Sequence, residues 1–303
     1  MTILLALTGV FNNCLVASVV WRTKQMKNST NFLLANNAIA EVFYLVTSAP
    51  VTAYLVLHRA RFITSATSVF LSNFLDFLVL MHTLLFCVTT MNLALLSIER
   101  YNALCNPMKI QRRLGKRGTK FCVLTMWLLA AILVLPVAIN FIMVEGFVVI
   151  EIFIYFCFMK GILTIITGCV VVYCYGRIIY GIYISKTIFT QTSCATIADD
   201  MKTKKNVVKM LLSITFTFLF AKLPVASYRA IMLYLGSSTP SEKDGIIFAA
   251  HTLGHASSFL NPIIYLLFSS NYRQGALRLL KSCSLNKVSN LPPTQQQARD
   301  YLK

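Results

Sequence analysis

The sequence has few charged residues for its length, and very few acidic ones. Charged residues make up 13% of the 303 residues and hydrophobic residues 57%, whereas an ordinary soluble domain is about a quarter charged. This balance nearly excludes a soluble protein. Only 10 residues are acidic against 28 that are basic. Such an excess can indicate a nucleic-acid partner, but the apolar content argues against one, so the positions of the basic residues must decide.

The sequence also lacks close cysteine pairs and enzyme signatures. Its nine cysteines form no Cys-x-x-Cys motif, so we predict neither a metal site nor a disulfide. It has no Ser-His-Asp pattern, Gly-rich phosphate loop or His-Glu-x-x-His run, which disfavours an enzyme, and no cofactor is expected. Internal repeats and broken helices at matching positions are missing too, so a channel or transporter is only an alternative.

Long apolar segments are what the sequence has in abundance. A helix needs about 20 mainly apolar residues to cross a membrane core about 30 Å thick, and helices satisfy their own hydrogen bonds in lipid. We predict an all-α membrane protein with a seven-transmembrane helix bundle over residues 1–283, a short amphipathic eighth helix on its cytoplasmic side, and a disordered tail over 284–303. The spans are 2–21, 31–57, 68–99, 118–142, 150–185, 206–235 and 245–268, and the eighth helix is 270–282.

The basic residues predict the orientation of the bundle. Most of the 28 Lys and Arg lie in the tail and in the loops on one side of the spans, and short cytoplasmic loops retain positive charge during insertion. We predict a multi-pass protein of the plasma membrane with an extracellular amino terminus and a cytoplasmic carboxyl terminus. The first span begins almost at Met1 and is expected to act as the insertion signal. The basic side then faces cytosol and membrane lipids, not nucleic acid.

Polar residues inside membrane helices are costly and usually mark working parts. They occur here in motifs distributed over the seven spans: Asn12-Asn13-Cys14-Leu15-Val16, Asn36-Asn37-Ala38-Ile39-Ala40-Glu41, Glu99-Arg100-Tyr101, Trp127, Tyr175, Phe218 with Pro224, and Asn261-Pro262-Ile263-Ile264-Tyr265. With these motifs in this order, the sequence resembles the rhodopsin-like G-protein-coupled receptors across roughly residues 2–283.

The resemblance implies a receptor that binds an extracellular ligand within the bundle and activates a heterotrimeric G protein, with arrestin as a further partner. Outward movement of helix 6 would open a cytoplasmic cleft for the carboxyl-terminal helix of the G-protein α subunit. The coupling and switch residues would be Glu99, Arg100, Tyr101, Tyr175, Phe218, Pro224, Asn261, Pro262 and Tyr265. A degenerate or non-signalling receptor of the same fold is the alternative.

Two of these motifs have a physical interpretation of their own. Arg100 ends an apolar helix, where its guanidinium can hydrogen-bond to Glu99 or, when released, to a partner's backbone carbonyls. An arginine that merely snorkels at a helix end is the alternative. Pro262 removes a backbone donor in mid-helix and invites a bend, while Asn261 and Tyr265 offer polar groups to the freed carbonyls.

The sequence departs from the family pattern at several positions. Leu75 stands where the family has its disulfide cysteine, so we predict no such disulfide. Thr167 replaces a proline in helix 5, and Lys222 replaces a tryptophan in helix 6. Lys204 stands where an acid could hold Arg100, so we expect a weakly held inactive state and ligand-independent signalling.

Helix 3 predicts where the ligand cleft lies. His82 lies a whole number of helical turns from Arg100, about 27 Å away on the same face. That face should point into the bundle interior, and it continues through Phe86, Thr89, Thr90 and Leu93. A cleft of this kind has aromatic and apolar walls with a few polar anchors.

The residues around this cleft indicate the ligand's chemistry. By resemblance, an amine would need an acid at the position of His82, and retinal a lysine in helix 7, and both are missing. Lys160 and Lys222 favour an anionic or hydrogen-bonding small ligand, unless Lys160 snorkels outward. The histidines favour bonding to ligand or water over zinc, because no acid or cysteine completes a metal site. The predicted ligand-binding residues are His82, Phe86, Lys160, Lys222, His251 and His255.

A second polar group is expected at the centre of the bundle. In the family, an acid at the position of Glu41 binds a sodium ion, and here Asn13, Thr89, Ser257, Ser258 and Asn261 would complete the site. Their oxygens suit a hard cation. Lys222 replaces the tryptophan above this chamber, so its ammonium can pair with Glu41, directly or through water, in place of sodium. The alternative is that Lys222 points into the ligand cleft. Beyond the eighth helix, Cys283 is a palmitoylation candidate or an unmodified surface cysteine.

Overall fold

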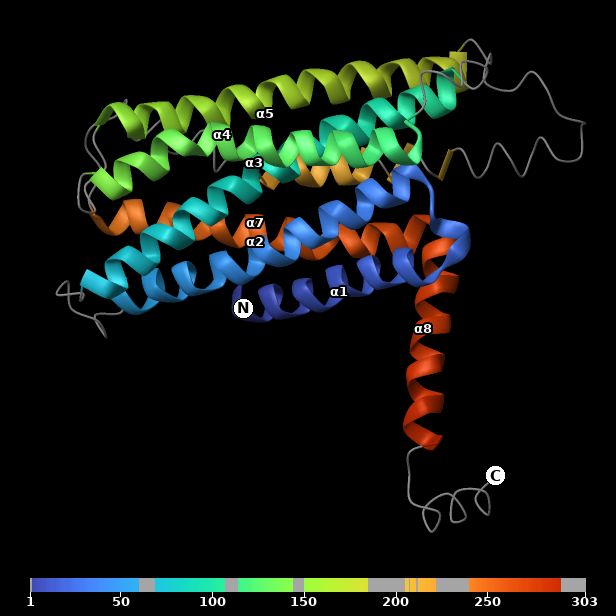
Figure 1. The fold of residues 1–303 in the computed structure, drawn as a ribbon, viewed down its shortest axis with the longest axis horizontal. Helices are drawn as coiled ribbons and strands as arrows, with labels where there is room; N and C mark the ends of the chain where they lie inside the picture. Colours follow the sequence, from blue (N-terminus) through green and yellow to red (C-terminus); the bar gives the residue numbers. More distant parts are fainter. Residues whose placement is uncertain are drawn as a thin grey trace, which may run out of the picture.

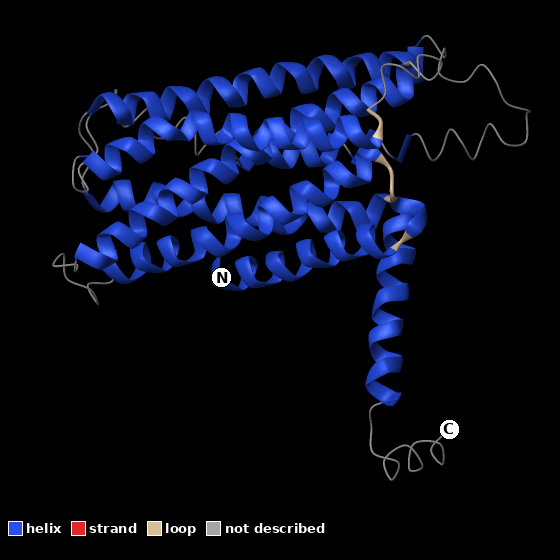
Figure 2. Ribbon diagram, viewed as in Figure 1, coloured by secondary structure: helices blue, strands red, loops and turns tan. Residues whose placement is uncertain are grey.

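The structure is a computed structural model that describes residues 2–59, 69–106, 114–143, 150–184, 205–206, 208–210, 212–221 and 240–289. These ranges contain helices and short connections, and no strand (Figure 2). The helices are α1 (Thr2–Arg22), η1 (Lys24–Met26), α2 (Ser29–Arg59), α3 (Val69–Cys105), α4 (Lys116–Met143), α5 (Ile150–Ile179), η3 (Tyr180–Ile184), α7 (Pro240–Phe268) and α8 (Ser270–Ser289). Lys204, Lys222, Pro224 and the side chains of His251 and Cys283 lie outside the described part.

The first five predicted spans are confirmed as helices long and apolar enough to cross a membrane. Helix 6 is described only as the shorter apolar stretch Val208–Ala221. The seventh predicted span corresponds to α7, which has 29 residues but buries several polar groups along one face, among them His255, Ser258 and Asn261. That polar face lowers the apolar signal of α7 without shortening the helix.

The outside of the bundle is apolar. On α4, Leu128, Ile132 and Ile142 are all exposed, and α5 presents Phe158 and Ile165 in the same way. Apolar patches of this extent are unusual on soluble monomers but match a hydrocarbon solvent. The surface therefore fits the membrane location that composition predicts.

Close packing of α1, α2 and α7 depends on glycines. A Cβ on Gly9 would lie 2.7 Å from Leu45 Cδ1, and one on Gly254 would lie 2.6 Å from Tyr44 Oη. Small residues let membrane helices approach each other in this way. α3 occupies the middle of the bundle, against α2, α4 and α5 (Figure 1).

Two helices continue well past their predicted carboxyl ends. The third span was expected to end at residue 99, but α3 continues to Cys105, because Tyr101, Leu104 and Cys105 pack against the main apolar core. Arg100 therefore lies inside a helix and not at its end. The eighth helix begins at Ser270, as expected, and runs to Ser289 rather than 282.

α8 turns away from the long axis of the bundle (Figure 1). A Cβ on Gly275 would lie 2.5 Å from Val19 Cγ1, so this glycine lets α8 rest directly on α1. Arg273 donates hydrogen bonds to the carbonyls of Leu266 and Leu267, at 3.2 Å and 2.7 Å. These bonds satisfy carbonyls at the carboxyl end of α7 and fix the turn between the two helices.

Candidate functional site

Arg100 sits between side chains from two other helices. It lies within electrostatic range of the hydroxyls of Tyr175, on α5, and Tyr272, on α8. Its Nε atom is buried and has no hydrogen-bond partner among the described residues. This placement favours an arginine packed among other helices over the snorkelling alternative. A buried donor without a partner is costly, so the guanidinium is held in a site that favours a new acceptor.

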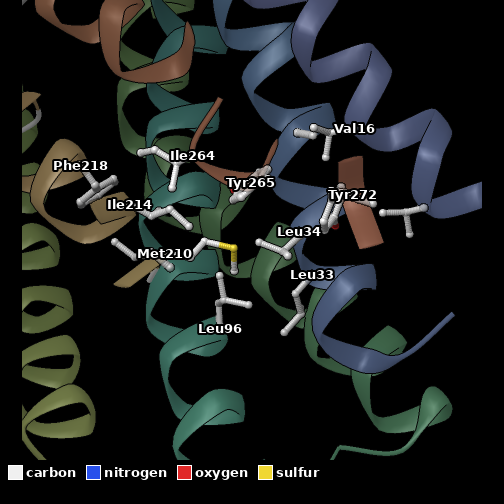
Figure 3. Packing of buried hydrophobic residues seen from close by; sticks show 14 of the residues in the cluster. Val16, Leu33, Leu34, Leu96, Met210, Ile214, Phe218, Ile264, Tyr265 and Tyr272 are labelled. Carbon is white, nitrogen blue, oxygen red and sulfur yellow. The ribbon is translucent and has the colours of Figure 1, made fainter. Parts of the chain in front are cut away.

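Aromatic residues surround this arginine. Ser97 donates a hydrogen bond to Tyr175 Oη at 3.0 Å, and the rings of Tyr265 and Tyr272 are 5.7 Å apart. The Tyr272 hydroxyl is also buried without a hydrogen-bond partner in the described ranges. Burial raises the pKa of the Tyr272 hydroxyl above its ordinary value, so this residue remains a neutral phenol. Figure 3 shows Tyr265 and Tyr272 beside the apolar core.

Glu99 has a backbone partner that the sequence did not predict. Its carboxylate is buried and accepts a hydrogen bond from the backbone N–H of Leu114 at 3.2 Å. It interacts with Arg100 electrostatically. Glu99 thus anchors the segment before α4 to α3, and the hydrogen bond from Arg100 to Glu99 stays a prediction. The neighbouring Tyr101 ring lies 6.1 Å from that of Tyr173 on α5.

Helix 6 contributes apolar residues to the same end of the bundle. Phe218 is buried together with Met210 and Ile214, and the three line one side of the cluster in Figure 3, facing α3 and Tyr265. The contacts of these three side chains are apolar, so this part of the interface can separate without the loss of a hydrogen bond. This property suits a helix that moves.

The predicted central polar group assembles in part. Ser258 of α7 donates a hydrogen bond to Glu41 Oε2 on α2. Asn13 of α1 donates from Nδ2 to the carbonyls of Gly9 and Ser258, at 2.9 Å and 3.0 Å. Glu41, Asn13 and Ser258 thus form one network across three helices.

The remaining central residues are buried around this network. Thr89 donates a hydrogen bond from its hydroxyl to the Phe86 carbonyl of its own helix, at 3.2 Å. Ser257 is buried on α7. The Oδ1 atoms of Asn13 and Asn261 are buried without hydrogen-bond donors among the described residues. Two unsatisfied amide oxygens and a carboxylate are the donor set that a hard monovalent cation accepts. These residues therefore fit the sodium ion that the resemblance implies.

The predicted ligand-binding residues divide into two groups. In the first, the His82 ring lies 4.6 Å from that of Tyr44, and Tyr44 in turn lies 6.5 Å from His255 in an edge-on arrangement. A hydrogen bond of 2.7 Å joins His255 Nε2 and the Ser48 hydroxyl. His255 is fully enclosed. Aromatic and hydroxyl contacts thus join α2, α3 and α7.

Lys160 forms the second group. Its ammonium lies 5.0 Å from the centre of the Phe86 ring and 4.0 Å from that of Phe156, and the side chain is only 5% exposed. Lys160 is therefore turned into the bundle and does not snorkel outward. The interior stripe on α3 is also confirmed, because it is buried throughout: His82, Phe86, Thr89, Thr90 and Leu93.

Sequence reasoning missed a hydrogen-bond network centred on Asn92. This residue donates to the Leu33 carbonyl and to Asn37 Oδ1, at 3.2 Å and 3.3 Å, and accepts from Asn36 at 3.2 Å. Trp127 of α4 donates to Asn36 Oδ1 at 3.2 Å. The signal was available, since Asn92 is a polar residue in mid-span. Thr167, at the expected proline position, similarly bonds the Thr90 carbonyl of α3 at 3.5 Å.

Comparison with known proteins gives a consistent result. A family model described as 7 transmembrane receptor (rhodopsin family) matches residues 12–265. The chain is 24% identical over 298 residues to the neuromedin-K receptor of Oryctolagus cuniculus, covering 93% of the chain and 61% of that receptor. It is 21% identical over 304 residues to the QRFP-like peptide receptor of Branchiostoma floridae, covering 95% and 78%. A shorter match, 29% over 139 residues, covers 46% of the chain and 32% of the endothelin-1 receptor of Bos taurus.

Proposed function

The chain belongs to the rhodopsin family of seven-transmembrane receptors, and from this premise we propose that it binds an extracellular ligand and activates a heterotrimeric G protein. It spans less than two thirds of the length of the neuromedin-K receptor. The Arg100 end of the bundle faces the cytosol in this proposal, and the amino terminus faces outward, in the plasma membrane. Arrestin is a further partner at the same cytoplasmic face.

The main support for this proposal is the buried position of the Arg100 Nε atom. A guanidinium with a buried, unpartnered Nε among the described residues gains a hydrogen bond when a carbonyl enters, and hydrogen bonds to charged groups are the stronger ones. Tyr175, which interacts with Arg100, belongs to the same buried cluster as Tyr265 of α7 and Phe218 of helix 6. Separation of Phe218 from the core would open space for the carboxyl-terminal helix of a G-protein α subunit. Arg100 then contacts the backbone of that helix.

Ligand recognition is proposed at the Lys160 group. A cation held against two aromatic rings is attracted to them, yet burial still removes much of its hydration. An anionic ligand group beside Lys160 would add an attraction of opposite charges to these ring contacts. The relatives' names include a peptide receptor, so we extend the expected small anionic ligand to peptides that present a carboxylate. His82 and Phe86 form the adjoining wall, and the predicted contact of His251 completes it.

A ligand screen tests both parts of the proposal. Cells that express the chain are exposed to a panel of peptides and small acids, with second messengers as the readout. A ligand that activates the native chain should lose about 10-fold to 150-fold in potency on Lys160→Met, as expected for a charged hydrogen bond. Lys160→Arg, which keeps the positive charge, should retain part of the native potency. Lys209→Met, which removes an exposed lysine near the Arg100 end, is the matched control at equal surface expression.

Two outcomes would contradict the proposal. If active ligands signal equally through Lys160→Met and the native chain, the anion site is wrong. If no G-protein class responds to a ligand that demonstrably binds, the chain is a non-signalling receptor of the same fold, which is the alternative to this proposal. Binding measured alongside signalling distinguishes these results.

A further inference from the structure

A pocket of about 290 Å³ opens at the Arg100 end of the bundle, and its lining includes none of the coupling or ligand residues. It lies where the end of α1, the short helix η1 and the beginnings of α2 and α4 meet. Its lining consists of apolar side chains on one side and lysines on the other: Val20, Trp21, Met26, Lys27, Asn28, Ser29, Phe32, Lys116, Thr119 and Lys120. Neither the family motifs nor the proposed mechanism uses this pocket.

All the charged side chains that line the pocket are positive. Lys27, Lys116 and Lys120 all line it and are exposed, and none forms an ion pair with a described residue. No Asp or Glu is among the lining residues. α2 begins at Ser29 and α4 at Lys116, so the positive ends of two helix dipoles also point to this place. Because no acidic side chain in the lining balances the three ammonium groups, the pocket favours a ligand with several negative charges.

The pocket is a built feature and not a loose gap between loops. Ser29 donates from its hydroxyl to the Leu114 carbonyl, which fastens the start of α2 to the segment before α4. Asn28 Oδ1 accepts a hydrogen bond from the backbone N–H of Asn31 at 2.8 Å and so caps α2. Met26, one of the lining residues, is buried. These contacts fix the spacing between the lysines on different elements.

The other side of the pocket continues onto the lipid-facing surface. Trp21 is 60% exposed, and Phe32 is half-buried beside it. Indole rings are typical of the membrane interface, where one edge meets hydrocarbon and the other meets headgroups. The pocket thus joins a basic chamber to an apolar wall at the level of the headgroups.

We propose that this pocket binds an anionic phospholipid of the membrane. The phosphate-bearing headgroup lies among Lys27, Lys116 and Lys120, and one acyl chain runs along Trp21 and Phe32. A neutral lipid would leave the three ammonium groups uncompensated, and a free phosphate compound would leave the apolar wall empty. A lipid bound here would fasten α4 to α1 and α2.

Native mass spectrometry of the full chain in detergent tests the proposal. The chain is mixed with equal amounts of phosphatidylinositol 4-phosphate, phosphatidylcholine and cholesterol, and bound lipids are counted. The native chain should retain the phosphoinositide preferentially. The triple variant K27Q/K116Q/K120Q should lose about 100-fold in affinity for it. Trp21→Ser should weaken it while leaving all three lysines in place.

The matched control changes the same charge elsewhere on the same end of the molecule. Lys24, Arg117 and Lys281 are exposed and do not line the pocket, so K24Q/R117Q/K281Q should retain the phosphoinositide like the native chain. Thermal melting of both triple variants verifies that each is folded, as expected for exposed substitutions.

Three results would overturn the proposal. Equal losses in the two triple variants would mean a diffuse charge effect. Preferential retention of cholesterol or phosphatidylcholine would mean a neutral occupant. Displacement of the lipid by soluble inositol 1,4-bisphosphate at equal concentration would mean that a free phosphate compound is the ligand, because a lipid held by its acyl chain as well should resist that competition.

Discussion

Ser258 donates a hydrogen bond from its hydroxyl to the Glu41 carboxylate and thereby joins α7 to α2 at the centre of the bundle. Asn13 extends the connection to α1 through the Ser258 carbonyl, at 3.0 Å. The Glu41 carboxylate thus connects α2 to α7, and Asn13 connects α7 to α1. In the mechanism that we propose, this polar centre is a fixed frame beside which helix 6 moves.

Removal of this bond should destabilise the receptor. Ser258→Ala leaves the buried Glu41 carboxylate with one donor fewer, and we expect a loss of about 1–2 kcal/mol in the free energy of unfolding. Thermal melting of the purified chain measures it. Ser257→Ala, which removes the neighbouring buried hydroxyl, is the control and should cost less. Equal melting temperatures for both variants would contradict the role given to Ser258.

Sodium should have little effect on the native chain, because we predict that the Lys222 ammonium occupies the place of the ion beside Glu41. Melting temperatures in sodium chloride and choline chloride at equal ionic strength should then agree. Lys222→Trp should create a sodium-dependent increase in melting temperature, and Glu41→Gln added to it should abolish the increase. A marked sodium effect on the unmutated chain would eliminate the pairing and favour Lys222 in the ligand cleft.

Gly254 should tolerate no side chain while Tyr44 is present. An alanine Cβ would lie 2.6 Å from Tyr44 Oη but 3.7 Å from the ring carbon Cζ. We expect Gly254→Ala to cost about 1–3 kcal/mol of stability through overpacking. The double variant Y44F/G254A should recover most of this loss in a double-mutant cycle. Gly176→Ala, where nothing lies within 4 Å of the added Cβ, should be neutral; a cycle without coupling would refute the contact.

Asn92 should be more important for stability than its isolated position in α3 suggests. Asn92→Ala removes bonds to Leu33, Asn36 and Asn37 together, so a loss of about 1–3 kcal/mol is expected. Asn140→Ala is the matched control, because Asn140 Oδ1 is buried with no hydrogen-bond partner among the described residues. Chemical denaturation in mixed micelles compares the two. A greater cost for Asn140→Ala than for Asn92→Ala would reject the network.

Hydropathy and helical period predicted much of this fold, for physical reasons. A run of about 20 apolar residues has one stable solution in lipid, so the limits of the first five spans agree with the structure to within a few residues, except at the end of α3. There the charge of Arg100 ended the apolar signal, whereas packing of Leu104 and Cys105 continues the helix. Tertiary contact decided a boundary that local composition could not.

The site was predicted less completely, because it depends on contacts between helices. The 3.6-residue period placed His82 and Phe86 on the interior face of α3. The same reasoning could not choose between an inward and an outward Lys160, because the answer rests on Phe86 and Phe156 from two helices. It likewise could not pair His255 with Ser48 of α2. Patterns along one helix say which face is buried but not which partner it meets.

The central claim is that this chain activates a G protein through Arg100, and reconstituted nucleotide exchange measures it most directly. The purified chain is placed in phospholipid vesicles with each class of heterotrimeric G protein, and guanine-nucleotide exchange is followed without ligand. Because Lys204 cannot hold Arg100 by charge, we predict that the native chain accelerates exchange on at least one class, that Lys204→Glu lowers this basal rate, and that Arg100→Gln abolishes it. Exchange no faster with the native chain than with Arg100→Gln, for every class, would contradict the account.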